Sequence, residues 1–246
     1  MSKRLSSCLQ QTGQSGQRKV LPFYGHAAGK PFKEFSNFYK QSKPFDFKLP
    51  IHARRSDLPD AVPCQFSEKA IMLTKAAMMG DIKTFKEIAS ATEPGKCKML
   101  GRRVKPFNPA LWEKHLEATA FEVVRQKFES DPKLRDLLLS TQDMLICEAT
   151  RNDKLWGIGI DVGDPLVQQP DRWPGRNVLG QALMAVRDHL SKKVNAASGP
   201  GLSSAVGDSD DDTEDVTVPN AETGRSADGT GAGGTAAASS KRARRG

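Results

Sequence analysis

The stretch NPALWEKHLEATAFEVVRQKFESD, residues 108–131, decides the fold class of this chain. Asn108 is a preferred N-cap residue, and Pro109 suits the first helical position, where its missing N–H needs no partner. The apolar residues that follow recur on one face of a helix: Trp112, Leu116, Ala120, Val123, Val124 and Phe128. One apolar face is typical of a helix that packs against a core. The sequence therefore predicts a fold built around one long amphipathic helix.

Shorter helical patterns flank the long one on both sides. They are SEKAIMLTKAAMMG (67–80), DIKTFKEIASA (81–91), EPGKCKMLGRR (93–103), DPKLRDLLLSTQ (131–142) and NVLGQALMAVRDHL (177–190). Ser67, Asp81 and Asp131 stand where an N-cap is expected, because their side-chain oxygens accept hydrogen bonds from the first free N–H groups of a helix. These patterns predict a fold in which helices dominate.

Strand patterns are fewer and shorter. VLPFYG (20–25), FDFKLPI (45–51) and MLICEAT (144–150) are rich in apolar and β-forming residues. Residues 52–63 are polar and contain proline, so a loop is expected there. Together the patterns predict an α+β, predominantly α-helical single compact domain over residues 20–194, with a few short strands.

The two ends of the chain differ from this domain in composition. Residues 1–19 are rich in Gln, Ser and Gly, and we expect them to be flexible. From Asn195 onward the chain has no aromatic residue and a net charge of −3, which leaves +11 on the rest of a chain whose formal charge is +8. Such a tail is expected to be disordered. Its terminal KRARR, residues 241–245, is a nuclear localisation signal, a nucleic-acid contact or an idle basic end.

Several functional classes find no support in the sequence. The four cysteines, at positions 8, 64, 97 and 147, match no zinc or thioredoxin spacing, so we expect reduced thiols in an intracellular protein, without metal or cofactor. No apolar run is long enough for a transmembrane helix, and the first residues have no secretory apolar region. No P-loop, dinucleotide-binding motif or serine-hydrolase elbow is present.

A few polar and aromatic residues are candidates for chemistry. Glu68 and Lys75 lie two turns apart on one face of the predicted 67–80 helix, about 10 Å along its axis, although the helix dipole alone would also explain an acid in the first turn. Trp156 follows Asp153 in a glycine-rich loop, and an aromatic ring beside a carboxylate suits a nucleobase. By its spacing, Trp112 is more simply a core residue. Trp173 is either a second stacking residue or a loop anchor.

Arginines offer two possible anion contacts. Arg176 precedes the last predicted helix in PGRN, where backbone N–H groups at a positive helix end would suit a phosphate. Arg102 and Arg103, in LGRR, are a second candidate, although such pairs are usually solvated surface.

The order of these motifs resembles the NADAR (YbiA-like) family from about residue 22 to 190. The resemblance rests on FSNF (35–38), FSEKAIMLTKA (66–76), LGRRV (100–104), the Trp112 helix, LLLSTQDMLICEATRNDKLWGIG (137–159) and GRNVLGQALMAVRDHL (175–190). It implies a compact, largely helical α+β fold that acts on N-ribosidic bonds. Some members look like N-glycosidases of riboflavin-pathway intermediates, and others remove ADP-ribose from guanine in nucleic acid.

The resemblance also implies roles for individual residues. The catalytic residues would be Glu68, Lys75 and Asp153. The substrate-binding residues would be Ser36, Asn37, Phe38, Arg102, Trp112, Trp156, Gly157, Arg176 and Asn177, with Gly180 in the same turn. The chain departs from the family at Lys69 and Ala70 and has a longer segment over 160–172, both at the expected pocket.

The resulting hypothesis is a hydrolase that removes ADP-ribose from guanine bases of DNA or RNA, in the cytoplasm or nucleus. A glycosidase acting on a small ribosylamino nucleotide of riboflavin synthesis and a non-catalytic ADP-ribose-binding module are the alternatives. Glu68 would stabilise the positive charge that develops at the ribose C1, facing Asp153 and Trp156. Lys75 would pair with Glu68 or attack C1 as an amine.

Overall fold

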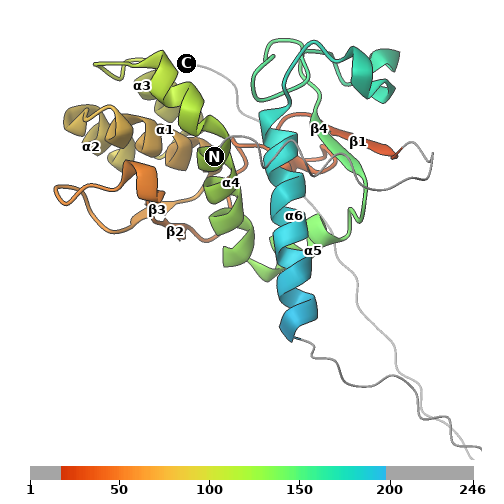
Figure 1. The fold of residues 1–246 in the computed structure, drawn as a ribbon, viewed down its shortest axis with the longest axis horizontal. Helices are drawn as coiled ribbons and strands as arrows, with labels where there is room; N and C mark the ends of the chain where they lie inside the picture. The colour runs from red at the N-terminus through yellow and green to blue at the C-terminus, as the bar shows by residue number, and fades with distance from the viewer. Residues whose placement is uncertain (1–17, 198–246) are drawn as a thin grey trace, which may run out of the picture. The chain divides into compact units, whose positions relative to one another are not determined.

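Helix α4, Pro109–Ser130, packs against α1 on one side and α6 on the other, so it stands between two groups of helices (Figure 1). The structure is a computed structural model that describes residues 18–197. Asn108 caps α4, because its side chain accepts a 3.0 Å hydrogen bond from the N–H of Leu111. The predicted apolar face is buried at Leu116, Ala120, Val123, Val124 and Phe128. The long helix that the sequence predicts is confirmed.

The remaining helices fall on the two sides of α4. On one side, α1 (Ser67–Met78), α2 (Ile82–Ser90) and α3 (Pro94–Gly101) contact one another. On the other side, α5 (Pro132–Leu139) and α6 (Val178–Ala197) do the same. Asp81 and Asp131 cap α2 and α5 as predicted, accepting hydrogen bonds of 3.0 and 2.8 Å from the N–H groups of Thr84 and Lys133.

The start of α1 differs from the prediction. Ser67 is already helical, and the N-cap position belongs to Phe66, whose side chain cannot accept a hydrogen bond. The N–H of Glu68 donates instead to the main-chain carbonyl of Asn37, at 2.9 Å. A distant segment thus replaces the expected serine cap, because any acceptor in the right place satisfies a free N–H.

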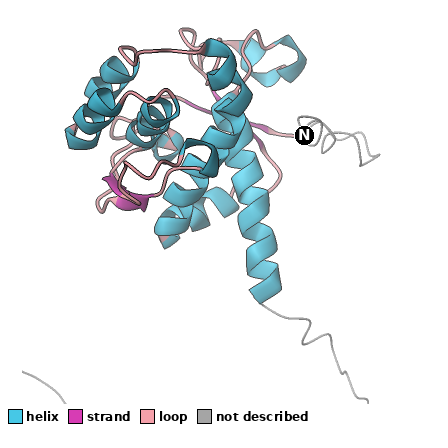
Figure 2. Cartoon of the chain, turned by 60° about the vertical axis from the view of Figure 1, so that its left-hand side comes forward, coloured by secondary structure: helices cyan, strands magenta, loops and turns pink. Residues whose placement is uncertain are grey.

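Two small sheets complete the fold (Figure 2). Strands β1 (Val20–Phe23) and β4 (Leu145–Glu148) pair in parallel, and β2 (Phe45–Phe47) pairs antiparallel with β3 (Val62–Cys64). The strands predicted at 20–25 and 144–150 are confirmed. The one predicted over 45–51 ends at residue 47, and the expected loop 52–63 reaches into β3. This strand was missed because it is three residues long and centred on a proline, which argues against a strand.

The core divides into clusters on the two sides of α4. Val123 belongs to the cluster with α1, α2 and α3, whereas Leu116 and Val124 belong to the cluster with α6 and β1. Two tryptophans, Trp112 and Trp156, are partly buried and pack against both clusters. They therefore mark the place where the two halves of the core meet.

The fold confirms the predicted α+β class with helix dominant. Residues 195–197 continue α6, although the prediction placed them in the tail. The predicted flexible segment up to residue 17 and the predicted disordered tail from 198, with its KRARR, lie outside the described residues. Within the described range, Cys64, Cys97 and Cys147 are free and buried. No helix of that range is long and apolar enough to cross a membrane.

Candidate active site

Glu68 is a buried carboxyl in the first turn of α1, with only 5% of its surface exposed. Burial raises its pKa to about 7. The nearby Asp153 adds to the rise, and the positive charges of Lys98 and Arg102 oppose it. Of the predicted site residues, Asp153 and Arg102 therefore lie close enough to Glu68 to act on its carboxyl, although they are far from it in sequence.

A second carboxyl of this cluster, Glu148, was not among the predicted site residues. It ends strand β4, and its pKa is raised to about 7 by burial first and then by Asp153 and Glu68. Lys98 again opposes the rise. The signal in the sequence was an acid at the end of an otherwise apolar strand, where even a half-buried charge is costly unless it is paired or lies in a cleft.

Glu68, Glu148 and Asp153 thus form one carboxyl cluster flanked by Lys98. Two groups with a pKa near 7 suit proton transfer at neutral pH, because one can hold a proton while its neighbour stays ionised. Within residues 18–197, no three His, Cys, Asp or Glu side chains are grouped so as to hold a metal ion.

Asp153 also shapes its own loop. Its Oδ1 accepts hydrogen bonds from the N–H groups of Leu155 and Trp156, at 2.9 and 2.8 Å. A side chain at Gly157 would come within 2.7 Å of the Glu148 carbonyl oxygen. The glycine is therefore required by the main chain of Glu148, whereas the sequence suggested close approach of a ligand.

Lys75 does not pair with Glu68. No ion pair joins the two among the residues that the structure describes. The Lys75 ammonium lies 4.2 Å from the ring centre of Phe107 and 5.9 Å from that of Trp112. Burial lowers its pKa. The ion-pair alternative for Lys75 is therefore wrong for this structure, and the amine alternative stays a prediction.

The FSNF segment reaches the cluster through Asn37 and Phe38. Asn37 is 7% exposed, and its side-chain oxygen is buried without a hydrogen-bond partner in the described part of the chain. The Lys98 ammonium lies 5.5 Å from the ring centre of Phe38. Ser36 is buried, and its hydroxyl accepts a 3.2 Å hydrogen bond from the N–H of Phe38, so it shapes the turn.

The beginning of α6 is not the phosphate site that the sequence suggested. The N–H groups of Arg176, Asn177, Val178 and Leu179 donate to carbonyl oxygens of the 154–157 loop at 2.8–3.1 Å. The Arg176 guanidinium pairs with Glu113 and Glu117 of α4, at 2.6 and 3.4 Å. These donors bind protein groups in place of an anion, so the predicted phosphate site on this helix end is wrong.

Asn177 and Trp173 have contacts within the protein as well. The Asn177 side chain is buried and bonds the main chain of β4 on both sides of Cys147. The Trp173 indole N–H donates to the Val167 carbonyl at 3.1 Å, which favours the loop-anchor alternative. Whether Arg176 and Asn177 also touch a substrate stays a prediction.

Comparison with known proteins shows the family to which the chain belongs. Residues 22–191 match the model of the NADAR domain. The chain is 40% identical over 122 residues to N-glycosidase R617 of Acanthamoeba polyphaga mimivirus, covering 50% of this chain and 72% of that protein. It is 32% identical over 161 residues to Protein irg-1 of Caenorhabditis elegans, covering 63% and 74%.

The NMR structure of the Escherichia coli protein YbiA has a similar fold. The TM-score is 0.56 at 28% sequence identity, and the match covers 73% of this chain and 89% of YbiA. The span that matches the family model, residues 22–191, contains Glu68, Glu148 and Asp153. This chain belongs to the NADAR family.

Proposed function

We propose that this chain is an N-glycosidase that hydrolyses an N-ribosidic bond, and that its substrate is guanine carrying ADP-ribose in DNA or RNA. The observation that carries the proposal is the carboxyl cluster, in which the buried Glu68 and the half-buried Glu148 each have a pKa of about 7 beside Asp153. Membership of the NADAR family and the similarity to N-glycosidase R617 support the reaction class.

The cluster has the groups that such a hydrolysis needs. The reaction breaks the bond between C1 of the ribose and a guanine nitrogen, and positive charge develops at C1. Ionised Glu68 takes a proton from the attacking water, or it only stabilises the charge at C1 while the water loses its proton to solvent. Protonated Glu148 donates its proton to the departing nitrogen, and the hydroxide from water ends on C1. Asp153 orients the ribose hydroxyls or assists the leaving group.

Lys75 offers a second route to the same products. Its lowered pKa, caused by partial burial, increases the neutral fraction that can attack C1 as a nucleophile. As the amine bonds to C1, the bond from C1 to the guanine nitrogen breaks and the amine proton passes to the base. The adduct opens to an imine, which water hydrolyses to ADP-ribose and free Lys75. The two routes differ in whether the enzyme forms a covalent intermediate.

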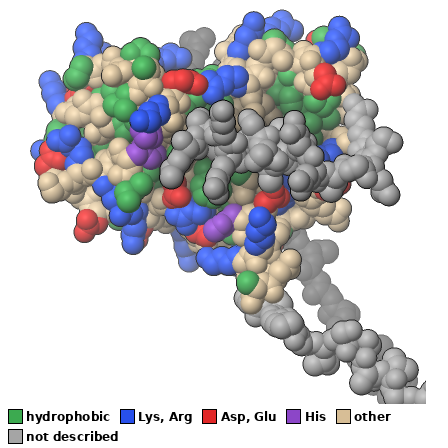
Figure 3. Space-filling model, in the orientation of Figure 1, with side chains coloured by type: hydrophobic (Ala, Val, Ile, Leu, Met, Phe, Trp, Pro, Cys, Tyr) green, Lys and Arg blue, Asp and Glu red, His purple; other side chains and the backbone are tan. Residues whose placement is uncertain are grey.

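Groups around the cluster suit the two ends of the substrate. Trp156 and Trp112 are partly exposed, as a base-stacking role requires, and stacking contributes about 1–3 kcal/mol per base. Lys98 and Arg102 supply positive charge for a diphosphate. Lysine and arginine side chains are spread over the visible face of the molecule (Figure 3), and the formal charge of the chain is +8. This charge favours nucleic acid over a small nucleotide. A DNA or RNA substrate would place the proposed activity in the nucleus or the cytoplasm.

The test is release of ADP-ribose from an oligonucleotide with one ADP-ribosylated guanine, followed under single-turnover conditions. A ribosylamino nucleotide of riboflavin synthesis is assayed in parallel as the alternative substrate. Turnover of the oligonucleotide, lost in Glu68→Gln, supports the proposal. Turnover of the small nucleotide alone would show that the ribosylamino nucleotide, rather than ADP-ribosylated guanine, is the substrate. Binding of ADP-ribose without any turnover would indicate a binding module and sink the enzymatic proposal.

A further inference from the structure

Lys127 of α4 is a lysine buried inside the core. Only 1% of its surface is exposed. Its ammonium donates hydrogen bonds to the main-chain carbonyls of Glu34 and Ser36, at 2.6 and 3.1 Å. It also lies 5.5 Å from the ring centre of Tyr39 and 5.3 Å from that of Phe128. Burying a charged side chain costs free energy, so Lys127 is expected to have a role that an apolar side chain could not perform.

No carboxylate of the described residues lies within ion-pair distance of Lys127. Burial lowers the pKa of Lys127 to about 7. The carboxylate of Glu34, which lies beyond ion-pair distance, opposes this shift. A hydrophobic side chain would fill the same space without desolvating an amine. What an apolar residue cannot do is donate hydrogen bonds to two carbonyls of one short segment.

That segment leads directly to Glu68. Ser36, whose carbonyl Lys127 holds, is followed by Asn37, and the Asn37 carbonyl accepts the 2.9 Å hydrogen bond from the N–H of Glu68. Because the N-cap residue of α1 has no side-chain acceptor, this carbonyl is what fixes the first turn of the helix. The side-chain oxygen of the same residue, Asn37, is buried and has no hydrogen-bond partner among residues 18–197.

We propose that Lys127 is a positioning residue: by holding the carbonyls of Glu34 and Ser36, it fixes Asn37 and, through Asn37, the place of the Glu68 carboxyl. The proposal deepens the N-glycosidase function proposed above and rests on it for its kinetic consequence. Its structural part, the link from Lys127 to the N–H of Glu68, does not depend on the substrate.

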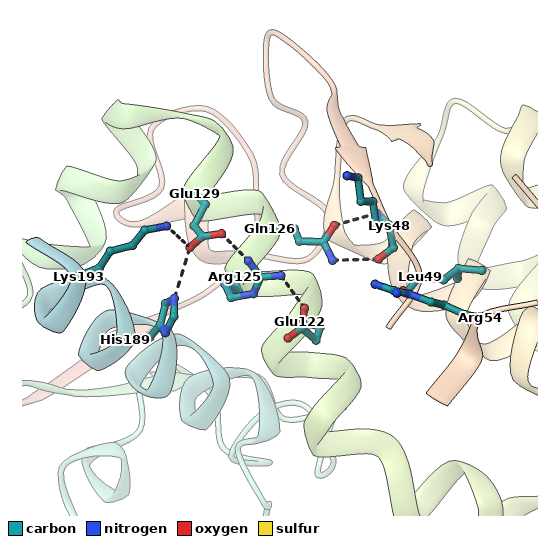
Figure 4. A network of polar contacts seen from close by, with 9 residues as sticks. All are labelled: Lys48, Leu49, Arg54, Glu122, Arg125, Gln126, Glu129, His189 and Lys193. Carbon is teal, nitrogen blue, oxygen red and sulfur yellow. Dashed lines mark hydrogen bonds and ion pairs between the residues drawn. The ribbon is translucent and has the colours of Figure 1, made fainter. Parts of the chain in front are cut away.

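The neighbouring Gln126 provides a matched control. It lies on the same helix, and its side chain also holds a main-chain segment, donating to the Lys48 carbonyl at 2.9 Å and accepting from the Lys48 N–H at 2.8 Å (Figure 4). None of its described hydrogen bonds involves residues 34–37 or Glu68. Loss of the two hydrogen bonds between Gln126 and Lys48 should therefore lower the stability of the protein without moving Glu68.

The experiment compares Lys127→Met, Lys127→Gln and Gln126→Ala with the unchanged protein. The exchange rate of the Glu68 amide hydrogen is measured by NMR, relative to core amides such as that of Leu183 in α6. In Lys127→Met we expect the Glu68 amide to exchange about tenfold faster relative to the core, the factor that one net hydrogen bond represents. Lys127→Gln retains a hydrogen-bond donor and is less disruptive to the fold. Its Glu68 amide should exchange at a rate between those of Lys127→Met and the unchanged protein. Gln126→Ala should leave the relative rate unchanged.

Turnover provides the second readout. If the oligonucleotide is a substrate, kcat should fall about 10²-fold in Lys127→Met with KM little changed, because a misplaced catalytic group costs rate on that scale. If the unchanged protein shows no turnover, the proposed function fails while the exchange measurement still tests the link. Equal Glu68 exchange in the Lys127 variants and in Gln126→Ala, or an equal fall of kcat in Gln126→Ala, would overturn the positioning role.

Discussion

The side chain of Asn177 holds the main chain beside Glu148. Its Oδ1 accepts a 3.2 Å hydrogen bond from the N–H of Glu148, and its Nδ2 donates to the Ile146 carbonyl at 2.9 Å. Asn177 has φ of 54°, a left-handed conformation that asparagine tolerates better than most residues. Gly180, one turn later, leaves room for the same Ile146 carbonyl. Residues 175–180, GRNVLG, therefore fix the end of β4, and with it the main chain of Glu148, against α6.

Replacing Asn177 by glycine tests this arrangement. Glycine accepts the positive φ, so the loss isolates the side-chain amide. Two buried main-chain groups would lose their partners, at a cost of about 1–3 kcal/mol each. We expect a lower denaturant midpoint and a reduced kcat. Gln181→Ala, which removes an exposed side chain that bonds the Arg176 carbonyl, is the control. Unchanged stability in Asn177→Gly would contradict a stabilising role for the hydrogen bonds from Asn177 to Ile146 and Glu148.

The buried charges predict an unusual dependence of stability on pH. The pKa of Glu68 and of Glu148 is raised from 4.5 to about 7, so between these values the folded state holds protons that the unfolded state has lost. The free energy of unfolding should therefore fall as the pH rises from about 4.5 to about 7, by at most about 3 kcal/mol for each group. Glu68→Gln should make this fall smaller, because only Glu148 then contributes to it. A profile that rises steadily over the same range would contradict the assignment.

Lys127 predicts the opposite slope at higher pH. Its pKa is lowered from 10.5 to about 7, so above about 7 the unfolded state binds the extra proton. Stability should then increase with pH from about 7 to about 10. Chemical denaturation at several pH values, with Lys127→Met as the variant that lacks this rise, measures the effect. A Lys127→Met profile that keeps the alkaline rise would show that another group causes it.

Trp156 combines two roles that can be separated. Because it packs against both core clusters and is only partly buried, Trp156→Ala should lose stability, but less than the about 3–5 kcal/mol of a fully buried tryptophan. Trp156→Phe should retain most of the packing and still weaken ADP-ribose binding, since the smaller ring stacks less. Calorimetric binding and the thermal midpoint are measured side by side. Unchanged binding in both variants would leave Trp156 as a core residue alone.

The local pattern of the sequence predicted most of the fold and part of the site. Helices with an apolar face and a capping residue, such as the one begun by Asn108, follow from spacing and hydrogen-bonding chemistry alone. The cap of α1 does not, because its acceptor, the Asn37 carbonyl, comes from a segment 31 residues earlier. For the same reason Glu148 and Lys98 were missed, since only the packed fold shows that they meet Glu68. The sequence also suggested an anion site at the beginning of α6. In the fold, the N–H groups there donate to carbonyls of the 154–157 loop, a contact that the local sequence does not reveal.

Glu68→Gln is the decisive variant for the mechanism. Glutamine retains the shape and the N–H bond to Asn37 while removing the charge, so the loss should fall on the chemical step. We expect single-turnover release of ADP-ribose to drop about 10²–10⁴-fold, the scale of a positioned acid–base group. Calorimetric binding of ADP-ribose should change little, because the product lacks the transition-state charge. If Glu68 only complements the helix dipole, stability would instead fall by about 0.3–1 kcal/mol with turnover intact.

Two further variants locate the chemistry if Glu68→Gln remains active. Glu148→Gln tests the proton donor, and it should spare a substrate whose leaving group needs no protonation. Lys75→Met tests the amine route. In the unchanged protein, borohydride added during turnover should reduce the ring-opened imine and leave the mass of ADP-ribose on Lys75 only if that route operates. A lysine held against Phe107 and Trp112 is placed in a partly desolvated site where its amine is a competent nucleophile. Full activity in all three variants would exclude both routes and return the carboxyl cluster to a structural role.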